Sequence, residues 1–154
     1  MTGCAHGPAT RCGLEIDGDY LTGKPGFFTL PVVQRVEDRM LEHMQGTADS
    51  RLNSPVELCR SLRGFSVRSH TDSTFISFGS RVSGITDCPG DKIVVATPAD
   101  GMWSHSALAH ELVHIAQRCM ARQPSEDGLD ADHANWSMDN IHSALEVVNQ
   151  ETVP

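Results

Sequence analysis

The sequence predicts an α+β fold in which a small, mostly antiparallel sheet packs against a central helix and a C-terminal helix. Three stretches rich in β-branched and aromatic residues indicate strands, at 65–70, 75–82 and 92–97. Apolar residues repeat with helical spacing before and after these stretches. The chain has 154 residues without a linker or an internal repeat, so we expect one compact domain over 1–154.

Two helices are expected before the strands. The first covers 31–45, where Thr29 can cap the start and Pro31 suits the first turn. The second covers 55–63, where Ser54 can accept a hydrogen bond from the first turn. Both segments are amphipathic, so both helices should pack one face on the core.

Glycine and proline predict irregular structure in two places. They recur throughout residues 1–29 and break any periodic pattern, so we expect an irregular N-terminal arm. They also recur over 84–90, between two predicted strands, where we expect a loop.

The stretch after the last strand carries the most informative pattern in the chain. From Trp103 to Met120 it is largely apolar and contains no glycine or proline, which favours a helix. Within it stands His110-Glu111-Leu112-Val113-His114, an H-E-x-x-H pattern. Histidines four residues apart lie on one face of a helix, so both imidazoles can bind one ion. Glu111 is offset around the helix and can act as a general base on a water at that ion. The pattern therefore predicts a zinc site.

A catalytic zinc usually has three protein ligands, so a third must come from another part of the chain. We expect His133, at the start of a last helix over 133–150 that Asp132 would cap. His142 lies nine residues further on, which on one continuous helix places the two imidazoles on opposite sides. The alternatives for the third ligand are Asp130, Asp132, His142 and Glu146.

Composition and charge limit the partners. The chain is 39% hydrophobic and 21% charged, which suits a globular protein, and no apolar run approaches the roughly 20 residues that span a membrane. Its formal net charge is -8, with 20 acidic against 12 basic residues, and the basic ones are scattered. Such a surface repels phosphate backbones, so we expect no nucleic-acid partner.

The cysteines bear on location. None of the five forms a C-x-x-C pair, so a separate zinc knuckle is not expected. Thr2-Gly3-Cys4 resembles the end of a bacterial lipoprotein cleavage site, which would make Cys4 a lipid anchor on an exported protein. The remaining cysteines would then be even in number and could form two disulfides in an oxidising compartment. The alternative is a cytoplasmic protein with free thiols.

From about 92 to 150 the chain resembles the zincin metallopeptidases of the minimal gluzincin or SprT-like type. His110-Glu111-x-x-His114 matches their core motif. Asp132-His133-x-x-Trp136 looks like the segment that carries the third ligand in SprT-like members. Two features depart from the family: Ala134 replaces a common glycine, and the basic character of the DNA-binding members is missing. In the gluzincin variant, the third ligand would be Glu146.

The resemblance implies a zinc-dependent peptidase that hydrolyses peptide bonds through a metal-bound water. Glu111 would be the general base, and His110, His114 and His133 the metal ligands. The substrate would be a peptide or protein, laid along an exposed strand edge. His105 or Trp103 could donate to the developing oxyanion.

Two other functions remain open. One is a peptidoglycan or amide hydrolase that uses the same zinc chemistry. The other is a non-catalytic, zinc-stabilised binding module. The presence of Glu111 speaks against the module, because a purely structural site does not need that carboxylate.

Overall fold

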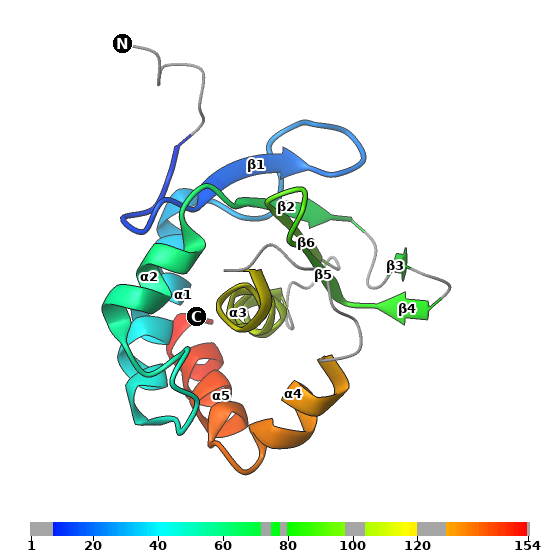
Figure 1. Ribbon diagram of the computed structural model, residues 1–154. Coiled ribbons are helices and arrows are strands. Elements are labelled where there is room, and N and C mark those ends of the chain that lie inside the picture. Colours follow the sequence, from blue (N-terminus) through cyan, green and yellow to red (C-terminus); the bar gives the residue numbers. More distant parts are fainter. Residues whose placement is uncertain (1–7, 72–74, 78–79, 98–103, 120–128, 154) are drawn as a thin grey trace.

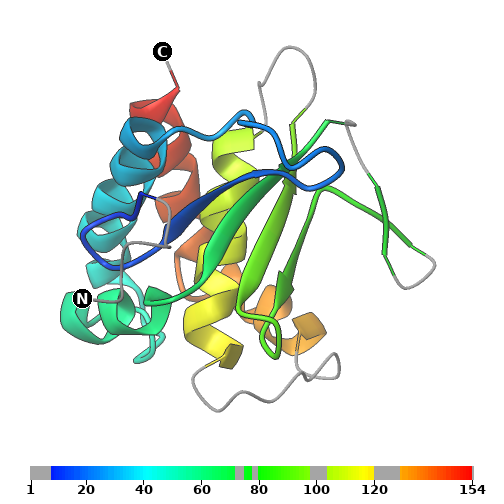
Figure 2. The same ribbon diagram turned by 90° about the horizontal axis from the view of Figure 1, so that it is seen from above.

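Helix α3 (Ser104–His114) lies at the centre of the computed structural model, which describes residues 8–71, 75–77, 80–97, 104–119 and 129–153 (Figure 1). One side of α3 packs on a four-stranded sheet, and the other side packs on α1 (Leu30–His43) and α5 (Ile141–Thr152) (Figure 2). The buried face of α3 includes Leu108 and Leu112, both fully buried. The helix with the H-E-x-x-H pattern is therefore the core helix of an α+β domain, as the sequence predicts.

The sheet is mixed, and the expectation of a mostly antiparallel sheet is wrong. Its strand order is β1-β2-β6-β5; β1 pairs with β2 and β2 with β6 in parallel, and only β5 pairs with β6 antiparallel. The four strands are β1 (Glu15–Asp19), β2 (Ser66–His70), β5 (Gly84–Asp87) and β6 (Lys92–Ala96). A separate hairpin pairs β3 (Phe75–Ser77) with β4 (Ser80–Val82). Strand direction depends on long connections, such as the two helices between β1 and β2, and short-range patterns do not reveal it.

Two strands occur where irregular structure is expected. The N-terminal arm over 1–29 contains β1, and the expected loop over 84–90 contains β5. Both are edge strands of the described sheet and consist mostly of half-exposed residues. Because they bury little side-chain surface, they lack the apolar alternation from which a strand is predicted; backbone pairing with the inner strands forms them.

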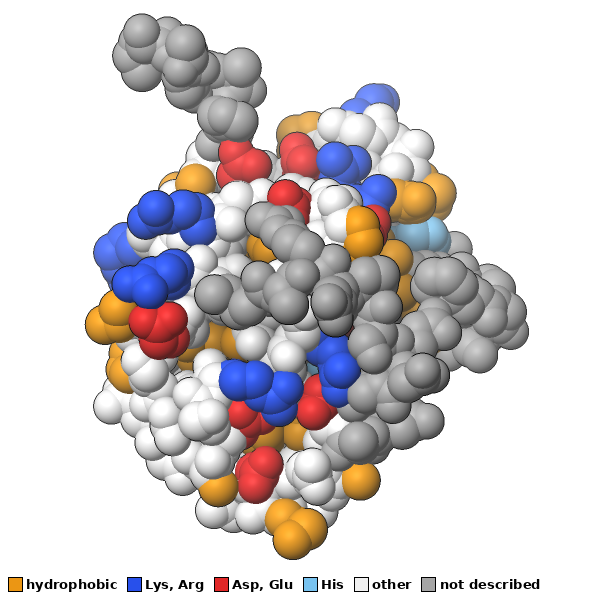
Figure 3. Space-filling model, in the orientation of Figure 1, with side chains coloured by type: hydrophobic (Ala, Val, Ile, Leu, Met, Phe, Trp, Pro, Cys, Tyr) orange, Lys and Arg blue, Asp and Glu red, His pale blue; other side chains and the backbone are white. Residues whose placement is uncertain are grey.

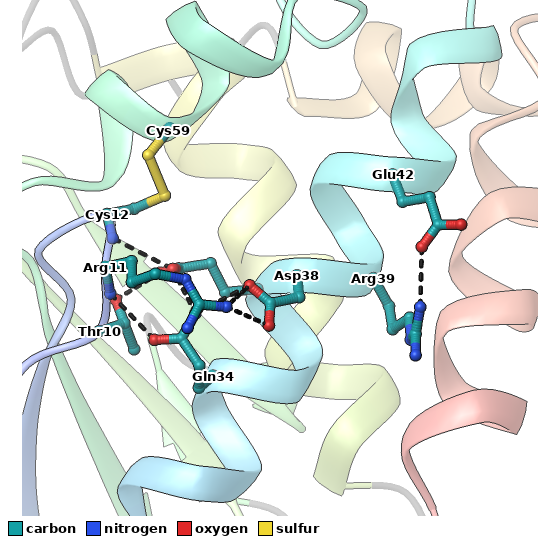
Figure 4. Close-up of polar contacts among 9 residues, drawn as sticks. Thr10, Arg11, Cys12, Gln34, Asp38, Arg39, Glu42 and Cys59 are labelled. Carbon is teal, nitrogen blue, oxygen red and sulfur yellow. Dashed lines mark hydrogen bonds and ion pairs between the residues drawn. A yellow bond between two sulfur atoms is a disulfide. The ribbon is translucent and has the colours of Figure 1, made fainter.

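The segment before β1 is bound tightly to α1 and to α2 (Pro55–Leu62) (Figure 4). A disulfide joins Cys12 to Cys59 of α2. The fully buried Glu37 of α1 accepts hydrogen bonds from the Thr10 hydroxyl and, at 3.1 Å, from the Cys12 amide. Burial raises the pKa of Glu37, and these hydrogen bonds oppose the rise.

The first two helices are as the sequence predicts. α1 begins after Thr29 and is followed by a short 3-10 turn, Met44–Gly46. The Ser54 side chain accepts a hydrogen bond from the Glu57 amide at 3.4 Å and so caps α2. Gly64 follows α2 with a φ of 84°, a left-handed conformation that favours glycine.

The expected single C-terminal helix over 133–150 is in fact two helices. α4 (Leu129–Trp136) ends before a turn, and α5 begins after Asn140, whose φ is 62°. Asp132 lies inside α4 instead of capping a helix. The break lets Trp136 and Ile141, both fully buried, enter the core from differently directed helices.

A second disulfide and the surface complete the fold. Cys88, in the turn between β5 and β6, is bonded to Cys119, at the end of the π-helical segment Ile115–Cys119 that continues α3. No helix in the described part of the chain is long and apolar enough to cross a membrane. Acidic and basic side chains are intermingled over the face shown in Figure 3. Cys4, the expected lipid anchor, lies outside the described residues.

Candidate metal centre

α3 places two imidazoles side by side on the face that turns toward α4. His110 and His114 are one helical turn apart, and their ring centroids are separated by 4.7 Å. His114 is 5% exposed and His110 is half-buried. Two histidines on a buried helix need polar partners, and the third imidazole of the site provides one.

His133 of α4 lies close to both His110 and His114. Its Nε2 atom lies 3.2 Å from His110 Nε2 and 3.0 Å from His114 Nε2. Two nitrogens bound tetrahedrally to zinc, each at about 2.0–2.1 Å, would lie about 3.3 Å apart. The three converging nitrogens therefore fit one metal ion, and the structure brings together the three residues that the sequence selects.

The protonation states also suit metal binding. Burial is the largest cause that lowers the pKa of His110 to about 4, and the nearby His133 and His142 lower it further. Burial is also the largest cause that lowers the pKa of His114 to about 3, and the neighbouring His110 and His133 add to the effect. Both imidazoles are therefore neutral at pH 7, which is the form that binds a metal ion.

Trp136 forms one wall of the site. Its ring centroid lies 4.5 Å from that of His110, 5.1 Å from His114 and 4.9 Å from His133. The indole is fully buried, and its Nε1 donates a hydrogen bond to Gln117 Oε1 at 3.3 Å. The sequence indicates an aromatic residue three positions after His133, but not this contact with all three imidazoles.

Glu111 points toward β5. The Thr86 hydroxyl donates a hydrogen bond to Glu111 Oε1 at 2.7 Å. A Cβ atom at Gly84 would lie 3.0 Å from Glu111 Cγ, so glycine gives the side chain room. Burial raises the pKa of Glu111 to about 7, and the hydrogen bond from Thr86 opposes the rise. Thr86 and Gly84 were missed because they lie in the expected loop, and no local pattern marks a strand that pairs beside α3.

Two of the competing ligand candidates, Asp132 and Glu146, do not belong to the metal-binding group found among the described residues. Asp132 forms ion pairs with Arg51 and Arg118. Glu146 is exposed on α5. The Asp130 side chain lies outside the described residues.

Three candidates remain: His142, an alternative third ligand, and His105 and Trp103, the candidate oxyanion donors. Because the helix breaks before Asn140, the placement of His142 and His133 on opposite sides of one helix is wrong. His142 is exposed, and its ring lies 5.5 Å from that of Trp136, next to the site. His105 is buried, with Nδ1 3.3 Å from the Thr152 hydroxyl, which indicates a packing role. Trp103 lies outside the described residues.

The buried Glu111 predicts a pH-dependent stability of the metal-free protein. Its folded pKa of about 7 exceeds the ordinary value of 4.5. Its contribution to stability is therefore complete below pH 4.5 and is lost as the pH rises through 7. At pH 8 the carboxylate should cost the fold about 3 kcal/mol, which Glu111→Gln removes. Denaturant unfolding of chelator-treated proteins at pH 4.5, 6 and 8 should show a stability advantage of the variant that grows with pH.

The exposed Glu146 offers the matched control for this experiment, since Glu146→Gln removes a surface charge without a burial cost. Equal stability of the Glu111→Gln variant and the parent at all three pH values would contradict a buried carboxylate at this position.

Comparison with known proteins identifies no relative. No family model, no curated protein and no solved structure matches the chain. Function therefore has to be inferred from the residues of the site.

Proposed function

We propose that the protein is a zinc-dependent peptidase with its active site at His110, Glu111, His114 and His133. The observation that carries the proposal is the convergence of three imidazole nitrogens from two helices: His133 Nε2 of α4 lies 3.2 Å from His110 Nε2 and 3.0 Å from His114 Nε2 of α3, and α3 also holds the buried carboxyl group of Glu111. The H-E-x-x-H pattern and the resemblance to zincins support the same reaction.

Different residues of the site would carry out different parts of amide hydrolysis. Zinc in this site would supply a Lewis acid that acidifies a water and polarises the scissile carbonyl. Glu111 accepts the proton of the attacking water and passes it to the leaving amine. The Thr86 hydroxyl orients Glu111 for this transfer. In the metal-free protein, burial raises the pKa of Glu111 to about 7, which shows that the surroundings favour uptake of a proton by this carboxyl group.

β5 offers a place for an extended substrate. It is an edge strand of the described sheet, and two of its residues, Gly84 and Thr86, adjoin Glu111. An edge strand can pair with an added peptide strand through its backbone groups. A peptide paired with β5 would pass Glu111, which favours a peptide or protein substrate over a small amide.

Ligand number argues against a purely structural zinc. A structural site is usually closed by four protein ligands, whereas the group found among the described residues has three histidines. A peptidoglycan or amide hydrolase with the same catalytic residues remains the second candidate, because its chemistry at the scissile bond is identical.

We further propose that the protein works in an oxidising compartment outside the cytoplasm. The disulfides Cys12–Cys59 and Cys88–Cys119 support this location, because such bonds persist where thiols are not kept reduced. Recovery of the protein from its native host with these four cysteines as free thiols would rule the location out.

The proposed activity is tested by incubating the zinc-loaded protein with a broad peptide library and, in parallel, with muropeptides. Mass spectrometry should show cleavage of internal peptide bonds that stops after chelation and returns when zinc is added. Cleavage of muropeptides alone would establish the second candidate. Tight zinc binding with no cleavage of either substrate would leave the binding module as the function.

A further inference from the structure

A polar cluster behind the metal site joins three segments that are distant in sequence. Its members are Asp49 and Arg51 from the α1–α2 connection, Gln117 and Arg118 from the π-helical segment, and Asp132 and Trp136 from α4. We call these six residues the α4 anchor. None of them belongs to the three-histidine group.

Arg51 is the centre of the α4 anchor. One guanidinium nitrogen of Arg51 donates a hydrogen bond to the backbone carbonyl oxygen of Gln117 at 2.9 Å. Another donates to Asp49 Oδ2 at 2.7 Å and lies 3.3 Å from Asp132 Oδ1. One side chain thus connects the α1–α2 connection, the end of the metal-binding helix and the helix that carries His133. A cation at the C-terminal end of a helix is also favoured by the exposed carbonyls there.

The anchor holds α4 on both sides of His133. Asp132, the preceding residue, pairs with Arg118 as well as with Arg51. Trp136, three residues after His133, donates to Gln117 Oε1, and the Gln117 amide group in turn donates to Asp49 Oδ2 at 3.1 Å. The two hydrogen-bonded routes from α4 therefore meet at Asp49 and Arg51.

α4 depends on such contacts for its position. It has only eight residues, too few for an isolated helix to be stable in water. Its backbone also lies close to few residues of the other described elements. Side-chain contacts, those of the α4 anchor among them, therefore help to fix the location of His133.

We propose that the α4 anchor positions His133 for metal binding, so that Arg51 and Asp49 control metal affinity without touching the metal or a ligand. The inference rests on the proposed metal site, but not on peptidase activity. It goes beyond that activity by assigning a function to a connection more than fifty residues away in sequence from the nearest ligand.

The two aspartates of the α4 anchor, Asp49 and Asp132, are balanced by two arginines, Arg51 and Arg118, and both carboxyl groups are largely buried. The Asp49 side chain is 6% exposed; burial opposes its ionisation, but hydrogen bonds from Arg51 and Gln117 outweigh burial and lower its pKa. Without Arg51, Asp49 would lose its cation and Asp132 would keep only Arg118. Such a network is a stronger constraint than an isolated surface pair, because Arg51, Asp49, Gln117 and Asp132 each contact at least two other members.

Arg51→Met tests the proposal, because it keeps an apolar stem and removes the charge and the donors. We expect the zinc dissociation constant, measured by competition with a chelator, to rise about 10-fold or more, as it does when support of a metal ligand is lost. The visible spectrum of the cobalt(II)-loaded protein should change as well. Arg51→Lys should be intermediate, because an ammonium cannot reproduce the two-sided contact of a guanidinium.

Two controls separate positioning from general effects. Arg60→Met removes an exposed arginine that pairs only with Glu57 on α2 among the described contacts, and its zinc affinity should equal that of the parent. Val36→Ala removes part of a fully buried side chain in α1 and should lower the stability of the core. As long as the metal-free variant stays folded, its zinc affinity should be close to that of the parent, because the α4 anchor is unchanged.

If Arg51→Met does not fold, Trp136→Phe takes its place. This variant keeps a ring against the histidines but loses the N–H donor to Gln117, and its zinc affinity should fall in a folded protein. Parental affinity in a folded Arg51→Met or, failing that, Trp136→Phe protein overturns the positioning role while the metal site stands. A parent protein that does not bind zinc overturns the metal site and this inference together.

Discussion

Glu111→Gln should lose about 10²–10⁴-fold in turnover of any cleaved peptide, while the zinc content stays at the parental level. Glutamine keeps the shape of the side chain and an oxygen that can accept the hydrogen bond from Thr86, 2.7 Å away in the parent. It cannot accept a proton near neutral pH, so the base is lost and the site geometry is kept. Turnover numbers and zinc per chain, measured on the same preparations, test both halves of the expectation.

The control for this result is Glu57→Gln. Glu57 is an exposed carboxylate on α2 that pairs with Arg60, so its loss should leave turnover unchanged. If Glu111→Gln cleaves peptides as fast as the parent, Glu111 is not the base, and the activity belongs to other residues.

His133→Ala should abolish tight zinc binding. The remaining pair, His110 and His114, is preformed on α3, but two imidazoles alone hold zinc much more weakly than three. We expect affinity to fall by more than the 10–100-fold that loss of an outer partner typically causes. Equilibrium dialysis against buffered zinc measures the effect, and circular dichroism of the metal-free variant verifies that the helix content of the protein is kept.

His142→Ala is the matched control, since it removes a neighbouring exposed imidazole whose ring lies 5.5 Å from Trp136. Its zinc affinity should remain close to that of the parent. Full zinc occupancy in His133→Ala, together with an empty site in Glu146→Ala, would replace His133 by Glu146 as the third ligand.

Some features of the site depend on local sequence, and others depend on long-range contacts. The positions of His110 and His114 follow from helical spacing, because a four-residue separation places both imidazoles on one face in any α-helix. His133 was selected by resemblance and by its expected place at a helix start, yet it lies within α4 after the chain has left α3. The surroundings of Glu111 could not be predicted, because Thr86 and Gly84 reach it only through the pairing of β5 with β6.

Features that depend on neighbours within a turn or two can be predicted from the amino-acid sequence. These are α1, α2 with its Ser54 cap, strand β6, and the central helix with the candidate ligands His110 and His114. Long-range contacts specify the parallel pairing of β1, β2 and β6, the edge strand β5, the break between α4 and α5, and the α4 anchor. The reason is that edge strands and a short helix gain little from their own side-chain pattern. Their positions come from backbone pairing, disulfides and ion pairs to residues tens of positions away, which no short stretch of sequence specifies.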